Sequence, residues 1–238
     1  MTRFRLLPAV AAALALAAPA AAITGGSLDG GAHPAVGLLL VDRGSGLEPD
    51  CTGSLVSPTV LVTAAHCVAG LPTNRFSVSF DPHYAPGSSS VVTGTGYADP
   101  LYGAVKSDSH DLGVVVLDAP VRGVAPFALP SAGWLDGAPL KSAVFTNVGY
   151  GYYDRTFTFD GYRRVSTSSF TNLKPTTITL ADKPGGVCFG DSGGPRLLGS
   201  TVVAVTSSGN NNCTGQSTSY RLDTQSARTF LSRFVAVP

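Results

Sequence analysis

Residues 188–195 have the sequence Cys-Phe-Gly-Asp-Ser-Gly-Gly-Pro. Ser192 lies between glycines and directly follows Asp191. This is typical of a nucleophile on a tight turn, because glycine lets the backbone bend sharply and lets a substrate approach the amide N–H groups. The amides of Gly190 and Ser192 are expected to donate to one carbonyl oxygen, and one such donor lowers a reaction barrier by about 3–4 kcal/mol. A surface turn has a similar composition, but the motif favours a serine hydrolase.

Two further motifs supply the groups that a serine nucleophile needs. A serine hydroxyl is a weak nucleophile at neutral pH, so it requires a base within hydrogen-bond reach and a carboxylate that orients the base. Residues 63–67, Thr-Ala-Ala-His-Cys, supply His66 as the base. Residues 110–117, His-Asp-Leu-Gly-Val-Val-Val-Leu, supply Asp111 at the start of an apolar run.

The order of these residues along the chain separates two kinds of hydrolase. Residues 190–194 also match G-x-S-x-G, the nucleophile elbow of α/β-hydrolases, in which the histidine follows the serine. All four histidines of the chain precede Ser192: His33, His66, His83 and His110. The order His, Asp, Ser therefore excludes the elbow arrangement.

Together these three motifs resemble those of the chymotrypsin/trypsin family of serine endopeptidases, in the secreted bacterial type with few disulfides. The resemblance extends over nearly all of the chain after residue 22. It implies that His66, Asp111 and Ser192 are catalytic, and that Asp111 has this role rather than the neighbouring Asp108 or Asp118. It also implies an all-β fold of two packed antiparallel β-barrels with a C-terminal α-helix.

The pattern of apolar residues agrees with this fold. Short strands separated by turn residues indicate a barrel or sandwich; they are expected over 35–41, 52–62, 76–80, 91–97, 112–117, 143–150, 162–170, 176–180, 201–207 and 217–222. Residues 119–132 contain three prolines and are interpreted as the crossover between the halves, with barrels over 23–122 and 123–238. Asp223 is expected to cap a final helix, in which Ala227, Phe230, Leu231 and Phe234 form one apolar face.

Residues 1–22 are interpreted as a signal peptide, and the protein as secreted. Arg3 and Arg5 precede an apolar stretch that ends in Ala20-Ala21-Ala22. A transmembrane anchor is the alternative, but the apolar run is shorter than the roughly 20 residues that span a bilayer. Loss of both arginines reduces the 16 basic residues to 14 against 15 acidic ones, so the net charge changes from +1 to −1.

Cleavage after Ala22 would expose Ile23-Thr24-Gly25-Gly26, which resembles the family's activated start, Ile-Val-Gly-Gly, apart from Thr24. The resemblance implies that the free α-amino group of Ile23 pairs with Asp191 and orders the oxyanion loop. Signal peptidase would then activate the protein directly. The alternative is that Ile23 only begins a strand.

Four cysteines in a secreted chain indicate disulfides, and four allow three pairings. The resemblance implies Cys51–Cys67 and Cys188–Cys213, each worth roughly 3 kcal/mol on the chain-entropy model and each next to a catalytic loop. The alternative, a metal site, is disfavoured because the pairs lack C-x-x-C spacing. No dense acidic cluster indicates calcium, and no cofactor is expected.

The substrate side chain on the acyl side of the scissile bond is expected to be apolar. The resemblance assigns the base of the primary pocket to Gly186 and Val187, one wall to Ser207-Ser208-Gly209, and part of the floor to Thr218. Relatives that cut after Arg or Lys usually carry Asp where Gly186 stands, and without it a buried basic side chain lacks a countercharge. Asp182 or Lys183 nearby leaves the alignment of this segment open. Residues 207–209 are expected to pair with the substrate backbone as an added strand.

Composition limits the remaining function classes. The 238 residues are 13% charged and include 28 Gly and 17 Pro, which suits a β-rich globule rather than a disordered chain. The net charge of +1 gives no argument for binding nucleic acid or a membrane. We expect a monomer that acts on protein or peptide substrates and can be bound by protein inhibitors. The alternatives are a non-catalytic binding protein of the same fold and a secreted serine esterase.

Overall fold

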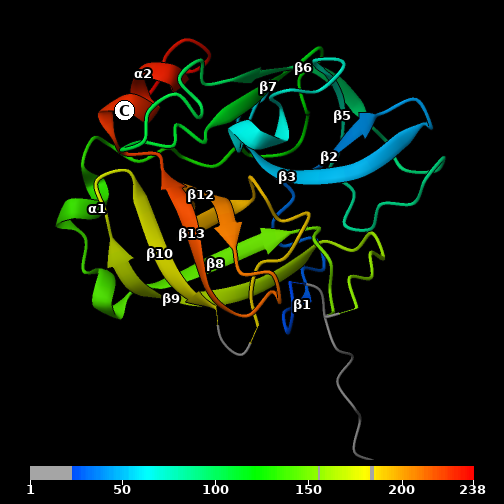
Figure 1. Cartoon of the computed structure of the whole chain (residues 1–238). Helices are drawn as coiled ribbons and strands as arrows, with labels where there is room; N and C mark the ends of the chain where they lie inside the picture. Colours follow the sequence, from blue (N-terminus) through cyan, green and yellow to red (C-terminus); the bar gives the residue numbers. More distant parts are fainter. Residues whose placement is uncertain (1–22, 155, 183–184) are drawn as a thin grey trace, which may run out of the picture.

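Two six-stranded antiparallel β-barrels make up the protein (Figure 1). The computed structural model describes residues 23–154, 156–182 and 185–238; the predicted signal peptide lies outside these residues. The first barrel closes in the order β2-β3-β4-β7-β6-β5. Its strands are β2 (Val36–Asp42), β3 (Leu47–Ser57), β4 (Val60–Thr63), β5 (Arg75–Ser79), β6 (Val92–Ala98) and β7 (Gly113–Leu117).

The second barrel follows a connection that includes the predicted boundary at residue 122. Its strands run in the order β9-β10-β13-β12-β11-β8, and a pairing of β8 with β9 closes the sheet. They are β8 (Val144–Gly149), β9 (Arg164–Leu173), β10 (Thr177–Asp182), β11 (Pro195–Leu198), β12 (Thr201–Gly209) and β13 (Gly215–Arg221). The short strand β1 (Ser27–Leu28) pairs with β9, so the N-terminal segment joins the second barrel. The predicted fold of two antiparallel barrels with a terminal helix is confirmed.

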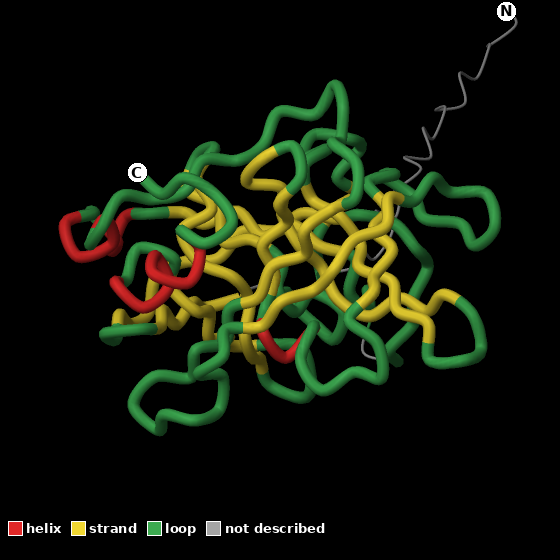
Figure 2. Tube along the Cα trace, turned by 90° about the horizontal axis from the view of Figure 1, so that it is seen from above, coloured by secondary structure: helices red, strands yellow, loops and turns green. Residues whose placement is uncertain are grey.

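Apolar side chains form buried clusters in both barrels and between them. One buried cluster, with Leu39, Leu61 and Val115, occupies the first barrel, and another, with Phe145 and Ile178, occupies the second. A third cluster contains residues of both barrels, and the apolar face of the C-terminal helix packs into it. Figure 2 shows the strands at the centre of the molecule with loops around them. The two barrels therefore share one part of the core.

The C-terminal helix α2 (Gln225–Leu231) differs from expectation at both ends. Its N-cap is Thr224, whose hydroxyl accepts a hydrogen bond from the Ala227 amide, so the predicted cap at Asp223 is wrong. Asp223 is buried and instead accepts from Arg221 and from the amide of Leu135. Phe234 lies beyond the helix and contacts Tyr97 of β6 with ring centroids 5.3 Å apart. The end of the chain thus returns to the first barrel.

The remaining helices are single turns: η1 (Ala65–Cys67), α1 (Trp134–Gly137) and η2 (Leu140–Ser142). None of the helices in the described residues is long and apolar enough to cross a membrane.

Candidate active site

Ser192 lies on a tight turn between β10 and β11. Gly190 and Gly193 on either side have φ angles of +93° and +75°, which L side chains rarely adopt. A Cβ at Gly193 would also collide with the hydroxyl of Thr63, so only glycine fits there. The amide of Gly193 donates to Thr206 at 2.8 Å, and that of Gly194 to Asp191 at 2.9 Å. These bonds fix the turn and leave Ser192 partly exposed.

The amides of Gly190 and Ser192 have no acceptor within the described part of the chain. Both residues line one cavity of about 410 Å³ together with His66. Two unpaired N–H groups beside a serine are suited to receive the oxygen of a substrate carbonyl as it gains negative charge.

His66 and Asp111 come together as their motifs predict. His66 lies in the turn η1 after β4, and Asp111 directly precedes β7, which pairs with β4. The carboxylate of Asp111 accepts from the backbone amide of His66 at 3.0 Å and from its Nδ1 at 3.0 Å. This places the ring so that Nε2 is the nitrogen available to a proton donor.

The hydroxyl of Ser207 is a third donor to Asp111, at 2.5 Å. Burial alone would raise the pKa of Asp111, but the hydrogen bonds from His66 and Ser207 hold that pKa below its ordinary value. Asp111 is therefore ionised at neutral pH. The sequence motifs assigned Ser207 to the pocket wall and gave no sign of this contact, because 96 residues separate the partners.

The other two aspartates near Asp111 have different partners. Asp118 is exposed and pairs with Arg75. Asp108 accepts from Ser226 and lies 3.5 Å from Nε2 of His110. Asp111 is the one of the three that contacts His66.

His66 and Ser192 line two neighbouring cavities together. No hydrogen bond joins their side chains in the described residues; such contacts are often long in unliganded enzymes and shorten when substrate binds. The side chain of His66 is 31% exposed and that of Asp111 is 5% exposed. The imidazole is thus accessible to solvent, and the carboxylate behind it is shielded.

The second cavity, of about 360 Å³, matches most of the predicted primary pocket. Val187, Ser207, Ser208 and Gly209 line it, together with Phe189, Asn210 and the Cys188–Cys213 pair, which the motifs did not assign to it. Gly186 and Thr218 are not among its lining residues. Gly186 packs against the side chain of Asp182, and Thr218 pairs with Ser208 on the neighbouring strand.

The first cavity has an aromatic wall that the sequence did not reveal. Tyr150, Tyr152, Phe159 and Phe189 line it. Three of these residues lie between β8 and β9, a stretch with no motif. Both cavities share His66, Phe189 and Ser192, so a peptide can extend from one to the other across the serine.

Asp191 is buried directly behind the turn. Its carboxylate accepts from the amides of Gly151 at 2.8 Å and Cys188 at 2.9 Å. Burial raises the pKa of Asp191 to about 6, although the two backbone hydrogen bonds favour the ionised form. Ile23 is also buried, with the unusual φ of +44° for a β-branched residue. In the uncleaved chain its nitrogen is an amide and carries no charge.

Both disulfides brace this site. Cys51 is joined to Cys67, beside His66, and Cys188 to Cys213, beside the serine turn. The sulfurs of Cys51 and Cys67 also lie near the His66 ring in a cluster of metal-ligand type. Because both sulfurs are in a disulfide, they are not available as thiolate ligands.

Comparison with known proteins agrees with this geometry. The family model described as Trypsin matches residues 23–230. A trypsin from Saccharopolyspora erythraea is 30% identical over 193 residues, which cover 74% of this chain and 82% of the relative. CLIP domain-containing serine protease B15 from Anopheles gambiae is 26% identical, over 70% of this chain and 55% of the relative.

Trypsin zeta from Drosophila erecta is 25% identical, over 67% of this chain and 64% of the relative. The chain thus spans between about half and two thirds of these two insect relatives. Among solved structures, neuropsin, a serine protease expressed in the limbic system of mouse brain, superposes with a TM-score of 0.68. It is 20% identical, over 84% of this chain and 94% of its own, which shows a shared fold. From residue 23 to residue 230, the chain belongs to the trypsin family.

Proposed function

We propose that the protein is a secreted serine endopeptidase that uses Ser192, His66 and Asp111 as a catalytic triad. The observation that carries the proposal is the bond of the His66 Nδ1 atom to the buried, ionised Asp111, near a serine whose own amide and that of Gly190 have no acceptor among the described residues. Family membership and the relatives named trypsin support it. Secretion is supported by the predicted signal peptide and by two disulfides, which form in oxidising compartments.

In this mechanism His66 removes the proton of Ser192 as the hydroxyl attacks the scissile carbonyl. The carbonyl oxygen becomes negative and is held by the amides of Gly190 and Ser192. His66, stabilised as a cation by Asp111, then donates the proton to the leaving amine. Water then takes the place of the amine: His66 removes its proton as it attacks the acyl carbon, and His66 returns that proton to Ser192 as the ester bond breaks and the acid leaves.

The residues around the pocket are evidence for a preference: the substrate side chain on the acyl side of the scissile bond should be apolar. The acidic residue beside Gly186 is Asp182, which is 3% exposed. It accepts from Ser168 at 2.5 Å and lies 3.6 Å from Arg196, so its charge is already balanced. A basic substrate side chain would enter this pocket without a free countercharge. A library of peptides varied at this position tests the preference; a maximum at Arg or Lys contradicts it.

The open edge of strand β12 is evidence that the substrates are peptides rather than other acyl compounds. β11 pairs with its residues 201–205, while Ser208 and Gly209 pair with β13 only and Ser207 lies at the register shift before them. Their second edge is therefore open among the described strands, beside His66 and Ser192. An extended substrate backbone can add to this edge by main-chain hydrogen bonds.

We assign activation to release of Ile23 by signal peptidase. Thr24 and Gly25 pack directly on Gly185, which lies two residues before Val187 of the second cavity. The N-terminal segment therefore contacts the loop that its free amino group would order. The new ammonium would pair with Asp191 and offset the cost of ionising that buried carboxyl. N-terminal sequencing of the active secreted protein should find Ile23 first.

A serine-directed phosphonate probe tests the proposed nucleophile. Intact-mass measurement of the mature protein should show one probe per chain, no probe on Ser192→Ala, and normal labelling of Ser200→Ala, which removes an exposed serine in the next turn. A folded wild-type protein starting at Ile23 that takes up no probe favours the non-catalytic binding protein instead. Labelling together with cleavage of esters but not of peptides favours the esterase.

A further inference from the structure

Thr52 on β3 carries a fully buried hydroxyl that touches the catalytic turn from the opposite barrel. Its Oγ1 donates to the carbonyl of Gly190 at 2.8 Å and accepts from the amide of Tyr150 at 3.2 Å. Its backbone amide donates to the carbonyl of Ser192 at 2.9 Å. One residue of the first barrel therefore holds both ends of the Gly190–Ser192 segment.

We infer that Thr52 is a positioning residue that keeps the oxyanion amides and the nucleophile in their reactive orientation. The inference rests on the proposed function and assigns Thr52 no contact with substrate. Its basis is that Gly190 must supply an N–H to the transition state from a backbone at φ +93°. A glycine has many other conformations available. The bond from Thr52 to the carbonyl of the same residue restricts that freedom.

Residues next to Thr52 also hold the turn that carries His66. Cys51, the preceding residue, is bonded to Cys67, which directly follows His66. The carbonyl of Thr52 accepts from the hydroxyl of Thr63, at the end of β4 and close to the same turn. Two successive residues of β3 thus hold the histidine turn and the serine turn, which come from different barrels. A shift of Thr52 would change the distance between His66 and Ser192.

Hydroxyl removal by Thr52→Val is the direct test, since valine keeps the shape of threonine. Loss of one neutral hydrogen bond that orients an oxyanion donor should lower kcat about tenfold. KM for a peptide substrate should stay within about twofold, because interactions made only in the transition state lower kcat and kcat/KM together. The rate of phosphonate labelling should fall with kcat, and Thr52→Ser should restore both.

Ser54→Ala is the matched control. Ser54 lies two residues further along β3, is equally buried, and its hydroxyl has no hydrogen-bond partner in the described residues. Its removal should leave kcat within about twofold of wild type. Titration of reactive sites with the phosphonate gives kcat per competent molecule and so separates slower chemistry from incomplete folding.

The outcomes distinguish the two proposals. A wild-type protein that neither cleaves nor labels overturns the proposed endopeptidase, and the positioning role with it. An active wild type whose Thr52→Val variant keeps its kcat, or raises KM at constant kcat, overturns the positioning role alone. The same conclusion follows if Thr52→Ser is as slow as Thr52→Val, because the hydroxyl is then not the group that matters.

Discussion

Asp111 accepts three hydrogen bonds through two oxygens, two from His66 and one from Ser207. An amide at this position has one acceptor oxygen and would present N–H groups to one of these donors, which favours the wrong tautomer of His66. We predict that Asp111→Asn lowers kcat about 10,000-fold near pH 7 with little change in KM. Steady-state kinetics checks this. The control is Asp108→Asn, three residues away with other partners, which should lower kcat by less than about tenfold. An Asp111→Asn enzyme that keeps a tenth of the wild-type kcat contradicts the assignment of Asp111.

Asp191 gives a prediction at alkaline pH. The α-amino group of Ile23 has an ordinary pKa near 8, and pairing with a buried carboxylate would raise it. The ion pair would then be present where Asp191 is ionised and the amino group is protonated, and it would be lost as pH rises through the raised pKa of the amino group. We predict that kcat/KM falls on this alkaline limb before the protein unfolds, as followed by circular dichroism. Acetylation of the N-terminus should remove activity at every pH, and a profile that stays flat until unfolding argues against the pair.

The sequence predicted the roles of some site residues and not of others. Ser192, His66 and Asp111 stand in short motifs whose local chemistry is specific, and these motifs predicted that the three would meet. Ser207 and Thr52 contact the same machinery through hydroxyls, but they have no distinctive local pattern. Their partners lie 96 and 138 residues away in the chain. Only the packing of the two barrels brings such residues together.

Strands with regular apolar patterns were predictable, whereas the first part of β3 and the short strand β11 were not. β7, with the sequence Gly-Val-Val-Val-Leu, matches its prediction within one residue. β3 begins at Leu47 rather than Thr52, since its first part is polar and exposed and gives no strand signal. β11 was not predicted, because it is four residues long and has Arg196 at a completely buried position.

Arg196 is stabilised inside the second barrel by groups from three other strands. Its guanidinium donates to Asn147 on β8 at 2.5 Å and to Ser217 and Ser219 on β13 at 2.5 and 2.9 Å. Asp182 of β10 lies 3.6 Å away and is itself bonded to Ser168 of β9. The interior of this barrel thus contains a polar network beside its apolar cluster.

Removal of one partner from this network should lower the stability of the fold. We predict that Arg196→Met lowers the free energy of unfolding by about 3–5 kcal/mol, because Asp182 remains buried without its cation. Urea unfolding on a Ser192→Ala background, which prevents self-digestion, measures the loss. Arg122→Gln, at an exposed position, should change it by less than about 0.5 kcal/mol. Addition of Asp182→Leu to Arg196→Met should recover part of the loss; if the double variant is less stable than Arg196→Met, the charge explanation is wrong.

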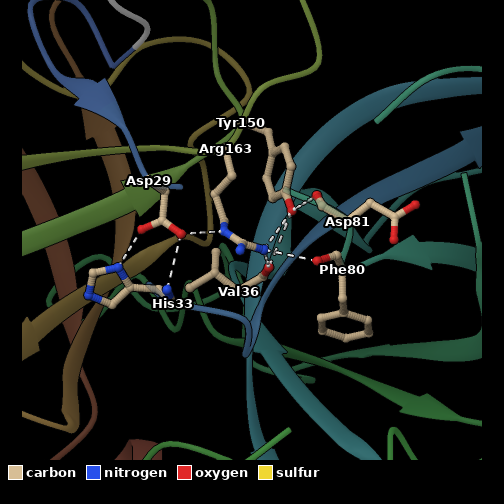
Figure 3. A network of polar contacts seen from close by, with 7 residues as sticks. All are labelled: Asp29, His33, Val36, Phe80, Asp81, Tyr150 and Arg163. Atoms are coloured by element: carbon tan, nitrogen blue, oxygen red, sulfur yellow. Dashed lines mark hydrogen bonds and ion pairs between the residues drawn. The ribbon is translucent and has the colours of Figure 1, made fainter. Parts of the chain in front are cut away.

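At the scale of the molecule, a second buried arginine joins the N-terminal segment to both barrels (Figure 3). Arg163, which is 1% exposed, donates to Asp29 at 2.9 Å and to the hydroxyl of Tyr150 at 3.0 Å. It also donates to the carbonyls of Val36 and Phe80 in the first barrel, at 3.1 and 3.0 Å. No pattern in the sequence indicates this network, since the partners are up to 134 residues apart.

Asp29 makes this junction sensitive to acid. Burial would raise its pKa, but hydrogen bonds from His33 and Arg163 outweigh that effect and lower the pKa of Asp29 to about 2. The unfolded chain has the ordinary value of 3.8. The carboxylate therefore stabilises the fold fully above pH 4, and this contribution, about 2 kcal/mol, is lost as pH falls through 2.

We predict that the difference in unfolding free energy between the wild type and Asp29→Asn shrinks by about 2 kcal/mol from pH 5 to pH 2. Denaturant unfolding at several pH values, again on the Ser192→Ala background, measures the difference. Asp42→Asn, at the exposed end of β2, controls for the loss of one carboxylate and should stay within about 0.5 kcal/mol of the wild type at pH 7. Parallel curves for the wild type and Asp29→Asn across this range would show that Asp29 does not stabilise the junction through its charge. The arginine would then be held by the carbonyls of the first barrel and by Tyr150, and the N-terminal segment would contribute little to the contact between the barrels.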